Sequence, residues 1–342
     1  MLNKVFELTE PRQIVPVYKN IDMDDTHLIV RPTRLSICHA DMRYYMGTRP
    51  KAVLKKKLPM ALIHEAIGRV EYDPTGTFRK GDDVVLIPNT PCEQDPFIAE
   101  NYLRSSVFRA SSCDGFMQEH VSMNPDRVLP LPDGIDPSVA AFTEIVSVSF
   151  HGISRLKAFS HERHDAIGVW GDGNLGYITG LLIRYMFPEA KLYIFGTSEF
   201  KLQDFAFADG TFLTDSIPQD MELDHCIECV GGVNASAAIN QIINTCIRPE
   251  GTISLLGVSE EPVPINTRMV LEKGLRLFGS SRSGRADFAG LLALYRKHPE
   301  LMNYLQKIVG MSFVVRDTRD MTEAFEADLH KSMGKTIMVW EV

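Results

Sequence analysis

The chain has no long apolar run and no excess of positive charge. None of its 342 residues lies in an apolar stretch of the ~20 residues that a membrane-spanning helix needs. The first ten residues lack the basic start and apolar middle of a signal peptide. Lys and Arg number 36 against 44 Asp and Glu, a formal net charge of −8, so no basic footprint for nucleic acid or an anionic membrane is present. We expect a cytoplasmic protein that binds neither nucleic acid nor membrane.

Cysteine is also scarce, with six in the chain. So few cysteines in a cytosolic protein of this size are more typical of thiols or metal ligands than of disulfides. Cys226 and Cys229 have the C-x-x-C spacing of redox and zinc motifs, but no second pair accompanies them. We interpret this segment as a buried strand that runs into a glycine turn, in which cysteine is a small hydrophobic residue.

The length suggests about two domains. Short β-type runs separated by Gly and Pro fill the first part and predict a mostly antiparallel or barrel-like lobe. These runs are residues 26–32, 66–72, 83–87, 116–121 and 127–131. Residues 138–156 contain no Pro and have apolar residues at near-helical spacing, which predicts a helix linking the domains.

Strands and helices alternate beyond this helix, which favours a parallel, doubly wound sheet. The predicted strands are residues 166–170, 191–195, 225–230 and 251–256, and the predicted helices are 175–187 and 235–245. Helices at 287–297 and 322–329 and a strand at 335–340 complete the chain. The expected fold class is α/β, with a β-rich lobe over residues 1–147 and a dinucleotide-binding domain over residues 148–281.

A glycine motif follows the first of these strands. Gly171, Gly173 and Gly176 match G-x-G-x-x-G, and Asn174 and Leu175 open the next helix. The first glycine permits the tight turn, the second allows close approach of a pyrophosphate, and the third lets helix and strand pack closely. Free N–H groups at the helix start would bind the pyrophosphate. The motif therefore predicts a dinucleotide site.

The second strand of such a domain indicates which dinucleotide is bound, because an acid at its end accepts the ribose 2′-hydroxyl. Here residues 191–195 are followed by Gly196, Thr197 and Ser198, without an acid. Their hydroxyls and the charge of Lys201 suit a 2′-phosphate, so we expect NADPH. The carboxylate of Glu199 is the one nearby feature that opposes this choice.

Four potential metal ligands stand out. His64 and Glu65 lie between apolar segments, Glu144 lies in an otherwise apolar helical stretch, and Cys38 adds a thiol. A buried carboxylate requires a cation or donors. Together the four form a sulfur, nitrogen and oxygen set suited to catalytic zinc, although a single buried His or Cys is often structural.

The order of these motifs resembles the zinc-dependent medium-chain alcohol and polyol dehydrogenases over nearly the whole chain. The shared motifs are Cys38-x-x-Asp41, His64-Glu65-x-x-Gly68, Gly81-Asp82-x-Val84, the glycine loop and the stretch from Gly251 to Gly257. Four stretches narrow the resemblance further: residues 38–45, 170–179, 279–284 and 322–328. In these the chain resembles the ribulose-5-phosphate reductases of teichoic-acid precursor synthesis. The resemblance implies a GroES-like catalytic domain, completed by residues 282–342, around a central Rossmann domain.

The resemblance also implies residue roles. Cys38 and His64 match zinc ligands, Glu65 an exchangeable or nearby carboxylate, and Glu144 the third ligand of the polyol branch. Asp41 matches the residue that orients the zinc-binding histidine. Lys335 aligns with a basic residue that contacts the cofactor pyrophosphate.

Two departures from the family pattern matter. Residues 89–113 contain Cys92 and Cys113 in place of the four closely spaced cysteines that hold a structural zinc, so one zinc per chain is expected. Ala40 stands where many relatives have the Ser or Thr that relays a proton. The sequence leaves the proton route open, and one through Glu65 is an option.

The function implied by the resemblance is reduction of D-ribulose 5-phosphate by NADPH with the help of zinc. We expect Arg43 to bind the substrate phosphate, with Arg49, Lys57, Arg104 and Arg109 as further cations of the same lobe. The resemblance also suggests a homo-oligomer and association with a ribitol-5-phosphate cytidylyltransferase. Two alternatives remain: a sorbitol- or threonine-type dehydrogenase with an unphosphorylated substrate, and a catalytically silent dinucleotide-binding subunit.

Overall fold

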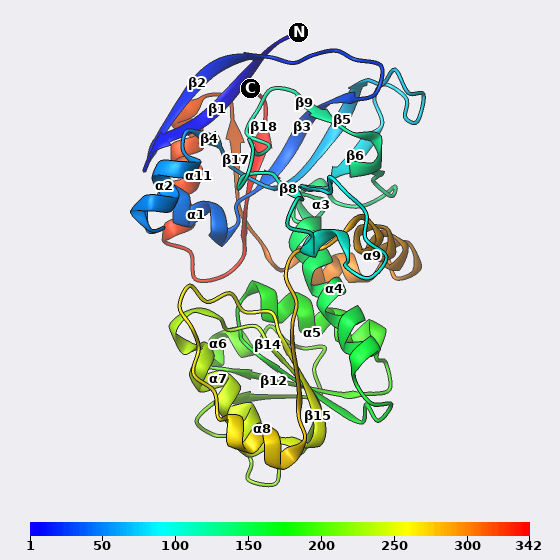
Figure 1. The fold of residues 1–342 in the computed structure, drawn as a ribbon, viewed down its shortest axis with the longest axis vertical. Helices are drawn as coiled ribbons and strands as arrows, with labels where there is room; N and C mark the ends of the chain where they lie inside the picture. The colour runs from blue at the N-terminus through cyan, green and yellow to red at the C-terminus, as the bar shows by residue number, and fades with distance from the viewer. The chain divides into compact units, whose positions relative to one another are not determined.

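The computed structural model describes residues 1–342, which divide into two compact units (Figure 1). Unit 1 combines Met1–Ile145 with Ser283–Val342, and unit 2 is Val146–Arg282. The sequence predicts boundaries after residues 147 and 281. The first observed boundary falls inside the helix α4 (Thr143–Phe159), which therefore belongs to both units.

Unit 1 is built on two β-sheets and a short strand pair. A three-stranded sheet has the order β2-β1-β4, and a seven-stranded sheet has the order β10-β6-β5-β3-β18-β17 with β9 paired to β3. Their strands are β1 (Leu2–Glu10), β2 (Gln13–Asn20), β3 (Leu28–Ser36), β4 (Met60–Ala61), β5 (Glu65–Tyr72), β6 (Asp83–Leu86), β9 (Val121–Met123), β10 (Val128–Pro130), β17 (Val309–Val315) and β18 (Lys335–Trp340). The antiparallel pairs of β3 with β5 and β18 join both ends of the chain in one sheet.

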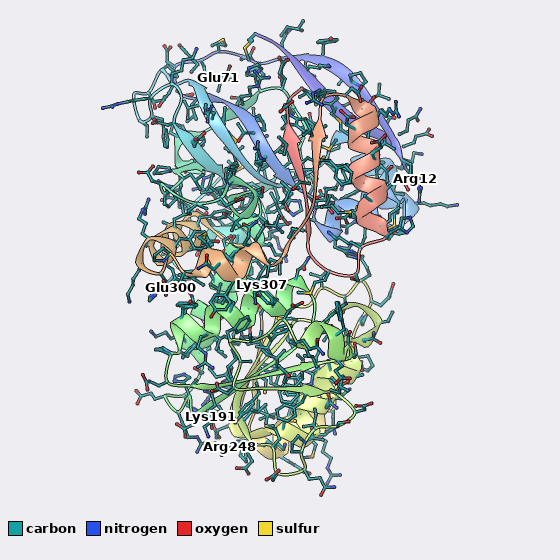
Figure 2. The ribbon with its side chains drawn as sticks, turned by 180° about the vertical axis from the view of Figure 1, so that it is seen from behind. Arg12, Glu71, Lys191, Arg248, Glu300 and Lys307 are labelled. Carbon is teal, nitrogen blue, oxygen red and sulfur yellow. The ribbon has the colours of Figure 1, made fainter.

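The helices of unit 1 pack around these sheets. They are α1 (His39–Tyr45), α2 (Lys51–Lys57), α3 (Pro137–Ala140), the start of α4, α9 (Arg285–Lys297), α10 (Leu301–Gln306) and α11 (Thr318–Leu329). The ring of Tyr45 on α1 stacks on Phe325 of α11, with centroids 4.6 Å apart. Arg12, in the turn between β1 and β2, pairs with Glu326 of α11 at 2.8 Å (Figure 2). These contacts hold α1 against the carboxyl-terminal part of unit 1. They thereby also position Cys38, the residue before α1.

Unit 2 contains a six-stranded sheet of the order β13-β12-β11-β14-β15-β16, in which every pair is parallel. The strands are β11 (Ala166–Trp170), β12 (Lys191–Gly196), β13 (Gly210–Leu213), β14 (Leu223–Glu228), β15 (Ile247–Leu255) and β16 (Arg276–Gly279). All residues of β11 and β14 are buried, as expected of central strands covered on both faces.

Helices cover the sheet of unit 2 (Figure 1). They are α5 (Asn174–Met186), α6 (Glu199–Leu202), α7 (Ala235–Gln241) and α8 (Thr267–Lys273). Right-handed crossovers run outward in opposite directions from β11 and β14, so α5 and α7 lie on opposite faces. This arrangement is the predicted doubly wound domain, with a switch of strand order between β11 and β14.

Several predicted elements need correction. The strand expected over residues 116–121 is wrong, because the N–H groups of Phe116 and Met117 bond to the carbonyls of Ile63 and Leu62 and β9 begins only at Val121. The helix expected over residues 235–245 ends as α7 at Gln241 and continues as a π-helical turn, Ile242–Cys246. The long β1 and β2 were not among the predicted strands.

The segment of residues 89–113 forms a short antiparallel pair, β7 (Asn89–Thr90) with β8 (Val107–Phe108), and a 3-10 turn, Glu100–Tyr102. Its Cys92 is exposed and Cys113 is half-buried. No helix of the structure is long and apolar enough to cross a membrane.

Candidate active site

Three predicted ligands meet in unit 1. One ligand atom each from Cys38, His64 and Glu65 lies within 4.8 Å of the other two. Cys38 precedes α1, His64 precedes β5, and Glu65 is the first residue of that strand. Residues far apart in the sequence therefore lie together, and they are three of the four predicted ligands.

Asp41 links the backbone of this cluster to its histidine. Its carboxylate accepts hydrogen bonds from the N–H of Cys38 and the N–H of Ile63, both at 3.1 Å. Its Oδ1 also lies 3.4 Å from Nδ1 of His64. A carboxylate on one ring nitrogen orients the other nitrogen for a metal, which is the role the resemblance implied.

The turn before His64 is strained. Ile63 has a φ of 70°, a left-handed conformation that a β-branched residue rarely adopts. Such a conformation costs of order 1–3 kcal/mol and persists where the surroundings fix it. Here Asp41 holds the Ile63 N–H, and the Phe116 N–H bonds to the Ile63 carbonyl at 2.7 Å. A Cβ on Gly115 would lie 2.2 Å from the Leu62 carbonyl oxygen, so glycine is required for this packing.

Glu65 is held on one side only. Its Oε1 accepts a hydrogen bond at 2.8 Å from Nζ of Lys335, which also donates to the Ile37 carbonyl at 2.8 Å. Its Oε2 is buried without a hydrogen-bond partner. A buried acceptor left unsatisfied is costly, and a cation beside it removes that cost.

The electrostatics of His64 also suit a cation. Burial opposes a positive charge on this ring, but Asp41 and Cys38 outweigh it and raise the pKa of His64 well above its usual value. The negative groups that raise this pKa, Asp41 and Cys38, also attract a metal cation beside the ring. Thiolate, imidazole and carboxylate are the ligands of catalytic zinc, so the residues present fit that ion.

Glu144 lies near this cluster without being part of it. Burial raises the pKa of Glu144 to about 7, with an opposing contribution from His64 and a reinforcing one from Glu65. Its carboxylate is not among the atoms that lie within 4.8 Å of one another. Its role as third zinc ligand stays a prediction.

Lys335 lies beside the ligand cluster of unit 1. Its observed partners, Glu65 and the Ile37 carbonyl, belong to the ligand cluster of unit 1. Burial opposes its charge, but Glu65 and Cys38 outweigh burial and raise the pKa of Lys335. Its contact with the cofactor pyrophosphate stays a prediction.

Cationic side chains gather beside Cys38. Burial, followed by the charge of Arg49, lowers the pKa of Arg43, while Cys38 acts in the opposite direction. Burial and then Arg43 lower the pKa of His39, with Lys331 and Arg49 contributing. Asp328 acts on the pKa of His39 in the opposite direction and is the ion-pair partner of Lys331. Arg109, by contrast, donates to the Ser122 carbonyl at 2.7 Å and serves the packing of its own loop.

The glycine loop of unit 2 has the expected geometry. Gly171 has a φ of 127°, and a Cβ on Gly176 would lie 1.9 Å from the Gly171 carbonyl oxygen, so both positions require glycine. A Cβ on Gly173 would meet nothing within 4 Å of the protein. Asn174 and Leu175 form the first turn of α5, and the positive end of a helix favours an anion.

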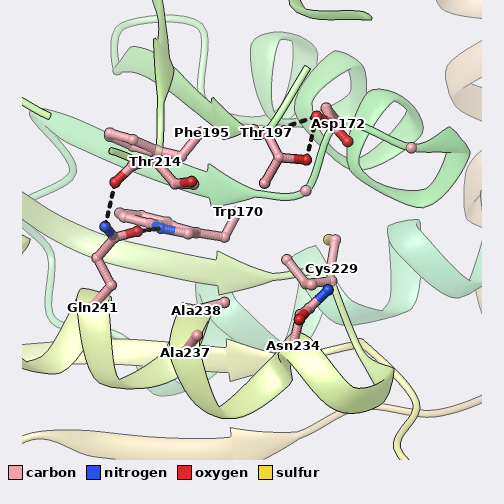
Figure 3. A pocket seen from close by; sticks show the side chains of 14 residues that line it. Trp170, Asp172, Phe195, Thr197, Thr214, Cys229, Asn234, Ala237, Ala238 and Gln241 are labelled. Carbon is pink, nitrogen blue, oxygen red and sulfur yellow. Dashed lines mark hydrogen bonds between the residues drawn. The ribbon is translucent and has the colours of Figure 1, made fainter. Parts of the chain in front are cut away.

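A pocket of about 500 Å³ opens beside this loop at the carboxyl ends of the parallel strands (Figure 3). Its lining residues are Trp170, Gly171, Asp172, Gly173, Phe195, Gly196, Thr197, Thr214, Cys229, Val230, Asn234, Ala237, Ala238 and Gln241. Trp170 stacks on Phe195 with centroids 3.9 Å apart, and its Nε1 donates to Gln241 at 2.9 Å. Gln241 in turn donates to the Thr214 carbonyl at 2.6 Å.

One acid of this pocket, Asp172, was not predicted from the sequence. The end of β12 carries no acid, but the Asp172 carboxylate accepts a hydrogen bond from the N–H of Thr197 at 2.7 Å (Figure 3). It accepts another from the N–H of Ser198 at 2.8 Å. The absence of an acid from residues 196–198 therefore does not leave this turn without a carboxylate. Asp172 lies between two motif glycines, and the motif assigns no role to that position. Thr214 was missed because it follows β13, a strand that the sequence analysis did not predict.

The other residues predicted to hold the cofactor lie close by. Thr197 is exposed at the end of β12, and Ser198 caps α6 by accepting a hydrogen bond from the Lys201 N–H at 3.5 Å. Cys226 and Cys229 are the predicted small hydrophobic residues. Burial raises the pKa of both thiols, and Cys226 lies inside β14.

Comparison with known proteins agrees with this geometry. Residues 24–133 match the alcohol dehydrogenase GroES-like domain. The chain is 52% identical to the ribulose-5-phosphate reductase of Bacillus spizizenii over the full length of both, and 43% identical to that of Streptococcus pneumoniae over 98% of the relative. The crystal structure of Staphylococcus aureus TarJ in complex with NADPH has a TM-score of 0.89 and 47% identity, with full coverage of both chains.

A GroES-like domain with a buried ligand cluster, joined to a doubly wound dinucleotide domain, defines a zinc-type medium-chain dehydrogenase. Within that class, the 52% identity to a ribulose-5-phosphate reductase over the full length of both chains determines the family. The chain belongs to the ribulose-5-phosphate reductase family.

Proposed function

We propose that this chain reduces D-ribulose 5-phosphate to D-ribitol 5-phosphate with NADPH and one zinc ion. The observation that carries the proposal is the 52% identity to a ribulose-5-phosphate reductase over the entire chain. The cluster of Cys38, His64 and Glu65 supports it, because three candidate zinc ligands gathered in one place argue against a silent subunit.

In the reaction, a hydride leaves C4 of the reduced nicotinamide and forms the new C–H bond at C2 of the ketose. The electron pair of the carbonyl double bond moves to oxygen, which then takes a proton, so NADP⁺ and a secondary alcohol result. The cofactor supplies the hydride, and the protein supplies position and electrostatic field.

Cys38, His64 and Glu144 would hold the zinc, with Glu65 as ligand or close neighbour. Zinc bound there supplies a Lewis acid that polarises a carbonyl. Asp41 fixes the ring of His64 and the backbone at Cys38. Lys335 offsets the charge of Glu65.

The dinucleotide would bind along the carboxyl edge of the sheet in unit 2. The Gly171 to Gly176 loop and the first N–H groups of α5 suit the pyrophosphate. The hydroxyls of Thr197 and Ser198, with the charge of Lys201, would hold the 2′-phosphate.

The substrate phosphate would bind the cations beside Cys38. Arg43 is the preferred anchor, and Arg49, His39 and Lys331 are its charged neighbours. A dianion relieves the mutual repulsion of these groups. Binding of the phosphate by these cations would also make the enzyme prefer a phosphorylated ketose to the unphosphorylated substrates of sorbitol-type dehydrogenases.

A panel of substrates and cofactors tests the proposal. The purified chain should reduce D-ribulose 5-phosphate with NADPH at a far higher kcat/KM than D-ribulose, fructose or 2-amino-3-oxobutyrate, and NADH should be the poorer donor. Equal rates with D-ribulose would favour the sorbitol-type alternative. No turnover of any ketose by zinc-loaded protein would favour the silent subunit.

The proposal extends to the surroundings of the enzyme. Ribitol 5-phosphate is the substrate of a cytidylyltransferase that makes CDP-ribitol for teichoic-acid synthesis, so we propose that this chain associates with that enzyme in the cytoplasm. We also propose that the chain forms a homo-oligomer. Sedimentation of the chain alone and mixed with the cytidylyltransferase tests both assemblies.

A further inference from the structure

The acid missing from the end of β12 is supplied by the glycine loop. Asp172 Oδ2 accepts from the N–H of Thr197 at 2.7 Å and from the N–H of Ser198 at 2.8 Å, and the Thr197 hydroxyl lies 3.4 Å away (Figure 3). One carboxylate oxygen therefore collects the donors of the turn that follows the second strand.

Gly196 and Asp172 depend on each other. A Cβ on Gly196 would lie 2.6 Å from Cβ and 2.7 Å from Oδ2 of Asp172, which is too close for any side chain at position 196. The glycine thus creates no open space for a cofactor group, because Asp172 fills that space. The end of β12 has no acid in the usual place, and Asp172 reaches the same turn from the loop between β11 and α5.

This position is where the two dinucleotides differ. In a doubly wound sheet the adenosine ribose binds over the end of the second strand, where an acid favours a free 2′-hydroxyl and a basic or hydroxyl-rich turn favours a 2′-phosphate. The carboxylate of Asp172 repels a phosphate and already uses two N–H donors that a phosphate could take. Lys201 and the hydroxyls act in the opposite direction.

We propose that Asp172 is a specificity-determining residue that competes with the 2′-phosphate for the Thr197 and Ser198 N–H groups, and so limits the preference for NADPH over NADH. The inference rests on the proposed use of NADPH. It predicts that the natural chain binds the 2′-phosphate less tightly than the same turn would without the carboxylate.

Adenosine fragments test this without substrate or turnover. Titration calorimetry with 2′,5′-ADP and 5′-AMP gives the contribution of the 2′-phosphate as the ratio of the two dissociation constants. Asp172→Asn keeps the shape of the side chain and one acceptor oxygen but removes the charge. We expect it to raise the preference for 2′,5′-ADP by about fivefold or more, as removal of one neighbouring negative charge predicts.

Glu199→Gln is the matched control, because Glu199 is an exposed acid next to the same turn. Its change in the ratio should stay below about twofold, since exposed charges are screened. Asp172→Ser, which also lacks the charge, guards against a loop distortion specific to asparagine. Near-ultraviolet circular dichroism checks the fold of each variant.

Each outcome decides the proposal. An unchanged or lowered ratio in both Asp172 variants overturns it and makes Asp172 an anchor of an NADPH-competent turn. Failure of the natural chain to bind either fragment overturns it too, because the pocket would not be an adenosine site. Failure of the proposed function appears separately, as the absence of NADPH-dependent reduction of D-ribulose 5-phosphate by the natural chain.

Discussion

Nζ of Lys335 lies 2.8 Å from Oε1 of Glu65, and the two side chains are 3% and 0% exposed. The pair joins the last strand of the chain to the strand that follows the ligand histidine. Ile37, next to Cys38, supplies a second acceptor to the same ammonium group. The amino-terminal and carboxyl-terminal parts of unit 1 thus meet at the ligand cluster.

Removal of Lys335 should be strongly destabilising. Lys335→Met leaves Glu65 buried without its cation, and loss of one partner of a buried pair costs about 3–5 kcal/mol of the free energy of unfolding. Urea unfolding of the zinc-free protein measures this. The double variant Lys335→Met with Glu65→Gln should recover much of the loss.

Arg12 and Glu326 give the matched control, because their ion pair has the same 2.8 Å length but exposed fractions of 55% and 35%. Arg12→Met should cost less than about 1 kcal/mol. Equal costs for the two Met variants would show that burial of the Lys335 pair has no energetic consequence.

Cys38 should be essential for zinc. Elemental analysis is expected to give one zinc per chain, and Cys38→Ser should lose the ion together with at least about 100-fold of kcat/KM, because even residues that orient ligands contribute 10–100-fold. Asp41→Asn should lower kcat/KM by about 10–100-fold. Cys92→Ser, an exposed thiol outside the cluster, should keep both zinc and activity. Full activity of Cys38→Ser would refute the assignment.

The sequence predicted the parts of the molecule in which a local pattern determines structure. The strand over residues 166–170, the glycine loop and the strand over residues 335–340 are as expected, because a buried run and its flanking turn residues specify each of them. The strands β1 and β2 lack this signal, since β2 is largely exposed and the pair is stabilised by its mutual ladder.

The site likewise contains residues that the sequence predicts and residues that it does not. Cys38, His64 and Glu65 were found from residue type and order, and the structure brings them together. Asp172 was missed because its partners Thr197 and Ser198 lie in the turn after β12, 25 and 26 positions along the chain, and nothing local indicates which way its side chain points. The sequence alone suggests Gly196→Asp as a test of the preference for NADPH. In the structure the new side chain would collide with Asp172, so this variant would report on packing rather than on charge.

The glycines of the loop should separate folding from cofactor binding. Gly173→Ala adds a methyl group that meets no protein atom within 4 Å, so the thermal midpoint should stay unchanged while NADPH affinity falls by about tenfold or more as the pyrophosphate loses its close approach. Gly176→Ala, whose Cβ would lie 1.9 Å from a carbonyl oxygen, should lower both. Gly279→Ala is equally uncrowded and outside the pocket, so it should change neither. Fluorescence titration measures the NADPH affinity. Normal NADPH binding by Gly173→Ala would contradict the assignment of this loop as the pyrophosphate site.

His225 should make unit 2 sensitive to acid. Burial, followed by the charges of His161 and His164, lowers its pKa to about 4, with Asp224 acting in the opposite direction. Because the folded pKa is below the unfolded value of about 6.5, the stability from a neutral His225 is present above pH 6.5 and is lost as the pH falls towards 4, by about 2 kcal/mol at pH 5.

His225→Gln should therefore lose less stability than the natural chain between pH 7.5 and pH 5, as measured by thermal unfolding. His330→Gln, an exposed histidine, should follow the natural chain. Parallel losses in the natural chain and the His225 variant would mean that other groups cause the acid sensitivity.

Arg43 should separate a phosphorylated substrate from its unphosphorylated counterpart. A charge-assisted bond between a guanidinium and a phosphate is worth roughly 1.5–3 kcal/mol, so Arg43→Ala should reduce kcat/KM for D-ribulose 5-phosphate by about 10–100-fold. The slow reaction of D-ribulose should be unaffected, because that substrate has no phosphate to bind. Arg104→Ala, an exposed cation of the same unit, should leave both substrates unchanged. If Arg43→Ala weakened both substrates equally, the residue would act on the nearby Cys38 rather than on the phosphate, and the anchor would have to be sought among Arg49, His39 and Lys331.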